Sequence, residues 1–239
     1  MTIRHAAAAL LAASAVALVG RAQPPATLPK NVVPSTFRAQ LVVDDRFKDP
    51  ITNPDGTKGP DPRNRTGKIH CLVCEHGLAP VVAVFVRAEA TDPKVEPGLT
   101  KLLKGTDALL PKYRADKLAA FAMFLALDGG PKLVKLADGT EKETDKEYPD
   151  DEKRDAKAKA LKDYAAKTAT PNIPFGLAGA DSKALKEFAI GDEPVTVVIY
   201  NRLRIVNRWA LKADDLTDEK IDEILTATQG MITGAPAKK

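Results

Sequence analysis

Histidine and cysteine are concentrated in one short segment of this chain, His70-Cys71-Leu72-Val73-Cys74-Glu75-His76. The only other histidine, His5, lies close to the start of the sequence. Two thiols at C-x-x-C spacing can close a small disulfide, exchange disulfides with another molecule, or hold a soft metal ion. Since no other segment offers comparable chemistry, Cys71 and Cys74 are the candidate reactive residues.

The first 22 residues have the composition of a secretory signal peptide. A short basic start is followed by an apolar run over residues 6–20, and small residues lie near Ala22, where a signal peptidase would cut. The run is shorter than the ~20 apolar residues of a membrane-spanning helix. We expect an exported bacterial protein, periplasmic or extracellular, with an uncleaved N-terminal anchor as the alternative.

Export would place the two cysteines in an oxidising compartment, where neighbouring cysteines are normally paired. We therefore predict a Cys71–Cys74 disulfide. Closing so short a loop stabilises a fold by only about 2 kcal/mol, so the bond would act as a local clip.

The charge pattern gives no reason to expect a nucleic-acid partner. The formal net charge is +4, and it falls to +2 without Arg4 and Arg21 of the predicted signal peptide. Lysines and acidic residues are interleaved and form no basic stripe. The expected partner is another exported protein, with no membrane contact after signal cleavage.

From residue 80 onward the sequence alternates between strand and helix patterns. Residues 80–86 (PVVAVFV) form an apolar β-branched run, typical of a strand buried on both faces. Residues 194–200 and 203–211 predict a hairpin that turns at Asn201-Arg202. Further strands are predicted over 37–43, 118–127 and 172–177, and helices over 99–113, 151–168, 181–188 and 217–230.

These elements divide the chain into regions. The order from residue 80 is β-α-β-α-β-α-β-β-α, which predicts a three-layer α/β domain with a mixed sheet. The expected regions are a signal peptide (1–22), a Pro-rich linker (23–36), an N-terminal β/loop extension carrying the C-x-x-C (37–79), the main domain (80–230, with a charged insertion over 129–150) and a flexible tail (231–239).

This order resembles the thioredoxin fold. Residues 193–201 (EPVTVVIYN), with the strand and helix that follow, are similar to the thioredoxin ending of proline, threonine, apolar strand, tight turn, second strand and last helix. Residues 82–85 (VAVF) resemble the central strand before the thioredoxin active site. The resemblance spans roughly residues 80–230 and implies a thioredoxin-like three-layer α/β sandwich.

The resemblance also implies a C-x-x-C directly after the central strand, at the start of the next helix, where the helix dipole lowers the pKa of the attacking thiol. Here residues 90–93 stand at those positions without a cysteine, and Cys71 and Cys74 precede the strand. Because such a strand is ~20 Å long, we expect the two cysteines at the opposite pole of the sheet from the usual site. The thioredoxin cis-proline corresponds to Pro194, or else Val195 takes its place.

Three functions remain open for the cluster. In the first, the protein is a non-catalytic interaction or accessory protein, and Cys71–Cys74 is a structural disulfide. In the second, it is a thiol-disulfide oxidoreductase in which either cysteine attacks, protonated His70 and His76 stabilise a thiolate, and Pro194 supports the site.

In the third, Cys71, Cys74 and His76, with His70, bind zinc or copper(I). This is disfavoured because His70 and Cys71 are neighbours, and neighbouring residues of a strand point to opposite faces. We expect no other cofactor.

Overall fold

The computed structural model describes residues 37–87, 89, 91–127, 133–135, 137–139, 141–143, 151–180 and 183–234. The predicted signal peptide and Pro-rich linker lie outside these residues, as do Ala90, Asp181 and residues 235–239. Within the described residues, no helix combines the length and the apolar composition needed to cross a bilayer.

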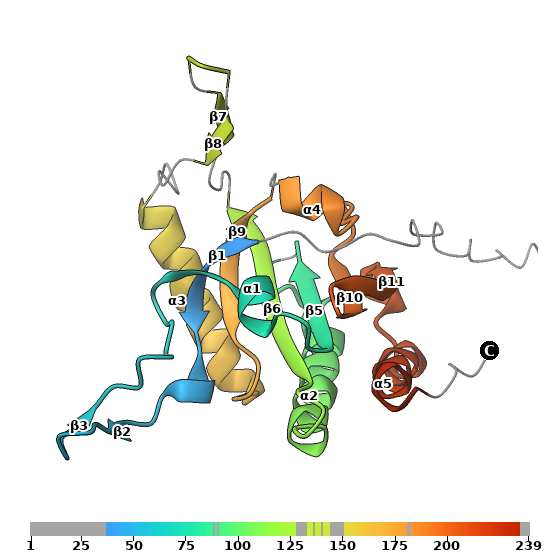
Figure 1. Cartoon of the computed structure of the whole chain (residues 1–239). Coiled ribbons are helices and arrows are strands. Elements are labelled where there is room, and N and C mark those ends of the chain that lie inside the picture. The colour runs from blue at the N-terminus through green and yellow to red at the C-terminus, as the bar shows by residue number, and fades with distance from the viewer. Residues whose placement is uncertain are drawn as a thin grey trace, which may run out of the picture.

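A seven-stranded mixed sheet forms the centre of the structure (Figure 1). Its strands in spatial order are β11 (Arg204–Leu211), β10 (Val195–Asn201), β5 (Val81–Val86), β6 (Ala119–Leu127), β9 (Phe175–Gly179), β1 (Arg38–Val43) and β4 (Ile69–Cys71). Strands β5, β6 and β9 are parallel, and β10 and β1 run antiparallel to them. Because β4 is antiparallel to β1, it runs in the same direction as β5.

Strand β5 is buried on both faces, as its continuous apolar sequence predicts. None of its six residues is more than 1% exposed. Val82, Val84 and Val86 contribute to the core on one face of the sheet, and Ala83 and Phe85 to the core on the other.

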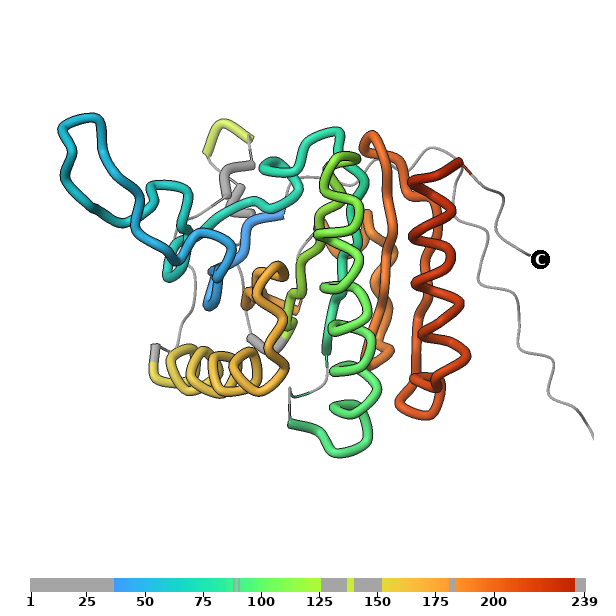
Figure 2. Tube along the Cα trace, turned by 90° about the horizontal axis from the view of Figure 1, so that it is seen from below, coloured from blue at the N-terminus to red at the C-terminus, as the bar shows by residue number. Residues whose placement is uncertain are grey.

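Helices cover both faces of the sheet and complete three layers (Figures 1 and 2). One face packs against α2 (Glu96–Lys112), α3 (Asp151–Thr168) and α5 (Asp218–Thr233). The other face packs against two short helices, α1 (Leu72–His76) and α4 (Lys183–Glu187). The predicted three-layer α/β architecture is therefore confirmed.

The predicted element order from residue 80 is also confirmed. The charged insertion holds a small hairpin, β7 (Leu133–Lys135) and β8 (Glu141–Glu143). The β10–β11 turn lies at Arg202-Leu203, one residue later than predicted, and both residues have the positive φ of a tight hairpin turn.

The N-terminal extension is part of the main sheet. Strands β1 and β4 add to the edge beyond β9, so the predicted boundary between residues 79 and 80 runs through one continuous sheet. A 3-10 turn (Asp45–Phe47) and a hairpin of β2 (Ile51–Thr52) and β3 (Lys58–Gly59) lie between them. The hairpin projects away from the body of the molecule in both views (Figures 1 and 2).

Candidate functional site

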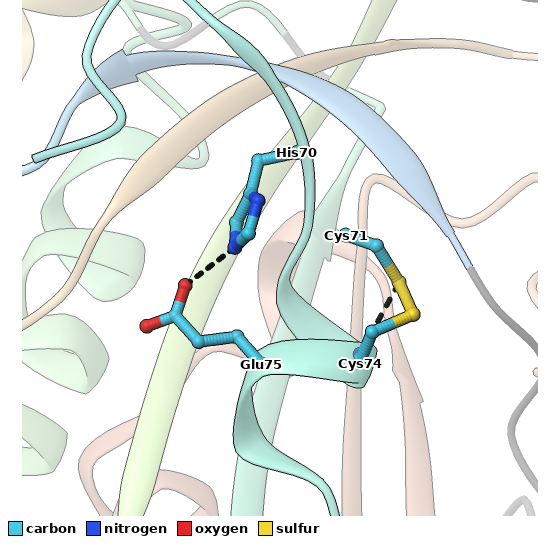
Figure 3. The surroundings of a disulfide bond; sticks show 4 residues. All are labelled: His70, Cys71, Cys74 and Glu75. Atoms are coloured by element: carbon cyan, nitrogen blue, oxygen red, sulfur yellow. Dashed lines mark hydrogen bonds and ion pairs between the residues drawn. A yellow bond between two sulfur atoms is a disulfide. The ribbon is translucent and has the colours of Figure 1, made fainter. Parts of the chain in front are cut away.

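The two cysteines form the predicted disulfide at the junction of β4 and α1 (Figure 3). Cys71 is the last residue of β4 and pairs with Arg38 of β1. It is also the N-cap of α1, where its Sγ accepts a hydrogen bond from the Cys74 N–H at 3.2 Å. One helical turn brings the two Cα atoms to 5.3 Å, within the usual disulfide range.

The local sequence explains why the chain turns here. Leu72 and Val73, between the cysteines, are buried against the sheet. Gly77 ends the helix with a φ of +55°, a conformation that glycine adopts without strain, and its N–H donates to the Val73 carbonyl.

The two cysteines differ in exposure. Cys71 is half-buried and packs against the core formed with Phe37, Phe85 and Phe121, whereas Cys74 is exposed. A molecule approaching from solvent therefore meets Cys74 first.

The prediction that the cysteines lie at the opposite pole from the end of β5 is wrong. Because β4 runs parallel to β5, Cys71 lies at the pole where β5 also ends. After Cys71 the chain runs back through α1 and the following loop to the start of β5 at the other end of the sheet. The prediction used only the length of β5 and did not include this return. Three strands separate β4 from β5, which places them about 19 Å apart across the sheet.

His70 does not face the disulfide. Its Nε2 lies 2.7 Å from Glu75 Oε2, on the other side of the chain from the sulfur atoms (Figure 3). Glu75 also pairs with Arg46 at 3.0 Å, and Arg46 forms two hydrogen bonds with the buried carboxylate of Asp44. Nothing in the sequence marked Arg46 and Asp44, because the contact of Arg46 with Glu75 depends on how β1 and α1 pack.

Glu75 is ionised within this network. Burial alone would raise its pKa, but the charge of Arg46 and the hydrogen bond from His70 outweigh burial and hold the pKa below its ordinary value. The network therefore ties α1 to the turn after β1 through charged hydrogen bonds.

His76 ends α1 and is half-buried against the core on the α1 face of the sheet. Its ring stacks on Phe121 with the centroids 6.3 Å apart, and its Nε2 is buried without a hydrogen-bond partner. Burial lowers the pKa of His76 to about 4, although the Glu75 charge opposes this. The ring is therefore neutral near pH 7 and carries no positive charge that could stabilise a thiolate.

These placements separate the proposed metal ligands. His70 is paired with Glu75, and His76 is packed on Phe121. In the part of the chain that the structure describes, no group of three or more histidine, cysteine, aspartate and glutamate side chains is arranged to hold a metal ion.

Arg87 occupies the place directly after β5, next to the loop that ends at Pro194. Its backbone N–H donates to the Pro194 carbonyl at 2.8 Å. Its side chain donates from Nε to the Gly191 carbonyl at 2.5 Å and from Nη2 to the Ala180 carbonyl at 3.3 Å. The guanidinium thus joins the loops that follow β5 and β9 to the loop before β10.

Pro194 lies where the resemblance predicts, beside the end of β5, because Val195 pairs with Val86. The bond before Pro194 is trans, since no cis peptide occurs among the described residues. Pro194 precedes β10, and Cys71 ends β4. Because β5, β6, β9 and β1 lie between these two strands in the sheet, the structure does not bring Pro194 and the disulfide together.

Comparison with known proteins gives similarity in structure only. No family model and no curated protein matches the chain. An uncharacterized conserved protein from Geobacillus kaustophilus is 13% identical, with 88% of this chain and 86% of that chain covered and a TM-score of 0.49. The bacterioferritin comigratory protein of Xanthomonas campestris is 14% identical, with coverages of 78% and 93% and a TM-score of 0.41. The yeast mitochondrial 1-Cys peroxiredoxin is 11% identical, with coverages of 85% and 76% and a TM-score of 0.47.

The fold is assigned from the arrangement of the strands and helices. The order of elements is the one expected from the sequence resemblance. Strands β5 and β6 are parallel and have helices on both faces, the antiparallel β10–β11 hairpin lies beside β5, and α5 is the last helix. The chain has a thioredoxin-like fold whose C-x-x-C disulfide lies at the edge strand β4 instead of after β5.

Proposed function

We propose that this chain is an exported thioredoxin-like protein that acts by binding another exported protein and not by catalysis. The observation that carries the proposal is Arg87. Its guanidinium donates to two backbone carbonyls at the carboxyl end of β5, where the resemblance implies a redox site. No cysteine follows β5 in the sequence, so the segment directly after this strand holds a structural arginine and none of the thiols that the resemblance implies there.

In this proposal the Cys71–Cys74 disulfide is structural. Both ends of the closed loop are anchored independently of the bond, Cys71 by its pairing with Arg38 and the helical turn by buried Leu72 and Val73. A framework that keeps the two Cα atoms 5.3 Å apart favours closure of the bond whenever it opens. The disulfide then adds about 2 kcal/mol by restricting the unfolded chain.

The proposal is tested with the mature protein and a peptide disulfide substrate in the presence of a small dithiol. We expect no acceleration over the dithiol alone. The double variant Cys71→Ala/Cys74→Ala should keep the fold and lose about 2 kcal/mol of unfolding free energy in urea. Catalytic turnover by the wild type that disappears in Cys71→Ser would overturn the proposal.

Export is a separate part of the proposal. It rests on the signal-like composition of residues 1–22. In a bacterial host the protein should be recovered outside the cytoplasm with an N-terminus close to Gln23. Recovery of the protein in the cytoplasm with its N-terminus intact would contradict export. It would not bear on the binding role, which the peptide-disulfide assay tests separately.

A second candidate function is thiol-disulfide exchange, and the exposure of Cys74 favours it. Cys74 is an exposed residue, and a disulfide sulfur that a partner thiolate can reach is open to attack, as exchange requires. The same peptide-disulfide assay separates the two functions, because exchange predicts turnover that depends on both cysteines.

A further inference from the structure

The two sulfur atoms of the disulfide are not equivalent. We propose that Cys74 Sγ is the sulfur through which this bond is opened, so that an external thiolate becomes attached to Cys74 and Cys71 leaves as the thiolate. The proposal concerns the direction of opening, and it holds whether the bond is structural or takes part in exchange. The sequence alone left open which of the two cysteines attacks a partner disulfide.

Access is the first reason. Thiol-disulfide exchange depends on which sulfur a thiolate can reach, and the attacker must approach the sulfur on the side away from the bond that breaks. Cys74 is exposed on the first turn of α1, whereas Cys71 is half-buried at the end of β4 and packs against the core. A thiolate in solvent therefore reaches Cys74 more readily than Cys71.

The leaving group is the second reason. The Cys74 N–H already lies 3.2 Å from Cys71 Sγ and points its hydrogen at it. When the bond breaks toward Cys71, this contact becomes a charge-assisted hydrogen bond to a thiolate, which is stronger than its neutral counterpart. A sulfur whose thiolate is stabilised leaves faster. Arg38, directly across the β1–β4 ladder from Cys71, adds a basic residue beside the same cysteine.

The exchange balances with a thiol as the only co-reactant. The thiolate RS⁻ forms a bond to Cys74 Sγ, the Cys71–Cys74 bond breaks, and its electron pair moves to Cys71 Sγ. The products are a mixed disulfide RS–S on Cys74 and a Cys71 thiolate, which takes a proton from water. With a dithiol, the second thiol then attacks the RS sulfur, closes the oxidised dithiol and releases Cys74 as a thiolate.

The test exposes the folded wild-type protein briefly to glutathione and then adds iodoacetamide in large excess over the glutathione. Iodoacetamide caps the protein cysteine that has been freed and consumes the remaining glutathione, so the mixed disulfide formed up to that moment is retained. Samples are then acidified, digested and mapped by mass spectrometry. We expect glutathione on Cys74 and the carbamidomethyl group on Cys71, in at least about tenfold excess over the opposite arrangement.

The matched control is the same protein unfolded in urea, where the difference in burial and the helical N–H are lost. There the two arrangements should form in similar amounts. Glutathione on Cys71 in the folded protein, or an equal distribution, would overturn the proposal. So would a folded protein that forms no adduct while the unfolded protein reacts, because Cys74 would then be closed to attack. The catalytic assay on a peptide disulfide is independent of all these outcomes.

Discussion

His76 should make the folded protein sensitive to mild acid. Burial against Phe121 lowers the pKa of its ring from 6.5 to about 4. The unfolded chain therefore takes up a proton near pH 6.5, while the folded chain resists it until about pH 4. The unfolding free energy that depends on His76 is fully present above pH 6.5 and is lost as the pH falls toward 4.

The size of the effect follows from this shift. Each pKa unit corresponds to about 1.4 kcal/mol, so the full loss is about 3 kcal/mol, of which about 2 kcal/mol falls between pH 7 and pH 5. The carboxylates contribute little in this window. Glu75 in particular has its folded pKa held below the ordinary value, so its contribution is lost only at more acidic pH.

The variant His76→Leu isolates the contribution. Because Nε2 of His76 is buried without a partner, an apolar side chain of similar size removes an unsatisfied polar atom and should not destabilise the fold at pH 7. Urea unfolding followed by circular dichroism at pH 7, 6 and 5 should show a loss of about 2 kcal/mol in the wild type and a markedly smaller loss in the variant. Parallel losses in the two proteins would refute the reasoning, because the acid sensitivity would then come from other groups.

Further predictions concern packing and the end of β5. Gly98→Ala should destabilise the fold by about 1–3 kcal/mol despite the better helix propensity of alanine, because the new Cβ would lie 2.5 Å from Leu216 Cβ and 2.7 Å from its carbonyl oxygen. Gly105→Ala is the matched control with a smaller cost in urea unfolding, since its Cβ meets only the flexible end of Leu225. Arg87→Met should lower the unfolding free energy by about 1–2 kcal/mol, because the two carbonyls it bonds lose a charged donor, and an unchanged midpoint would show that this contact is not structural.

The elements after residue 80 could be predicted because their apolar patterns are long. The apolar runs of β5 and β6 are too continuous for strands with one face in water. They are typical of neighbouring parallel strands in the middle of a sheet whose two faces are both covered by helices. Likewise α3 begins and ends at the predicted residues, since its Ala- and Lys-rich sequence is bounded by turn residues.

The site was harder to predict because it depends on long-range pairing. β4 has three residues, and its direction is set by the pairing of Cys71 with Arg38, which no local pattern encodes. The disulfide followed from the spacing of the two cysteines, but the end of the sheet at which it lies did not. Arg87 carried no signal either, because its hydrogen bonds join residues about a hundred positions apart in the chain.

The reduction potential of the Cys71–Cys74 pair tests the central claim most directly. It can be measured by equilibrating the folded protein with dithiothreitol redox buffers and quantifying the free thiols. A structural disulfide predicts a potential below about −300 mV, out of reach of the glutathione pool. A potential between about −180 and −120 mV, in the range of proteins that exchange disulfides, would contradict the structural role and establish the pair as a redox site.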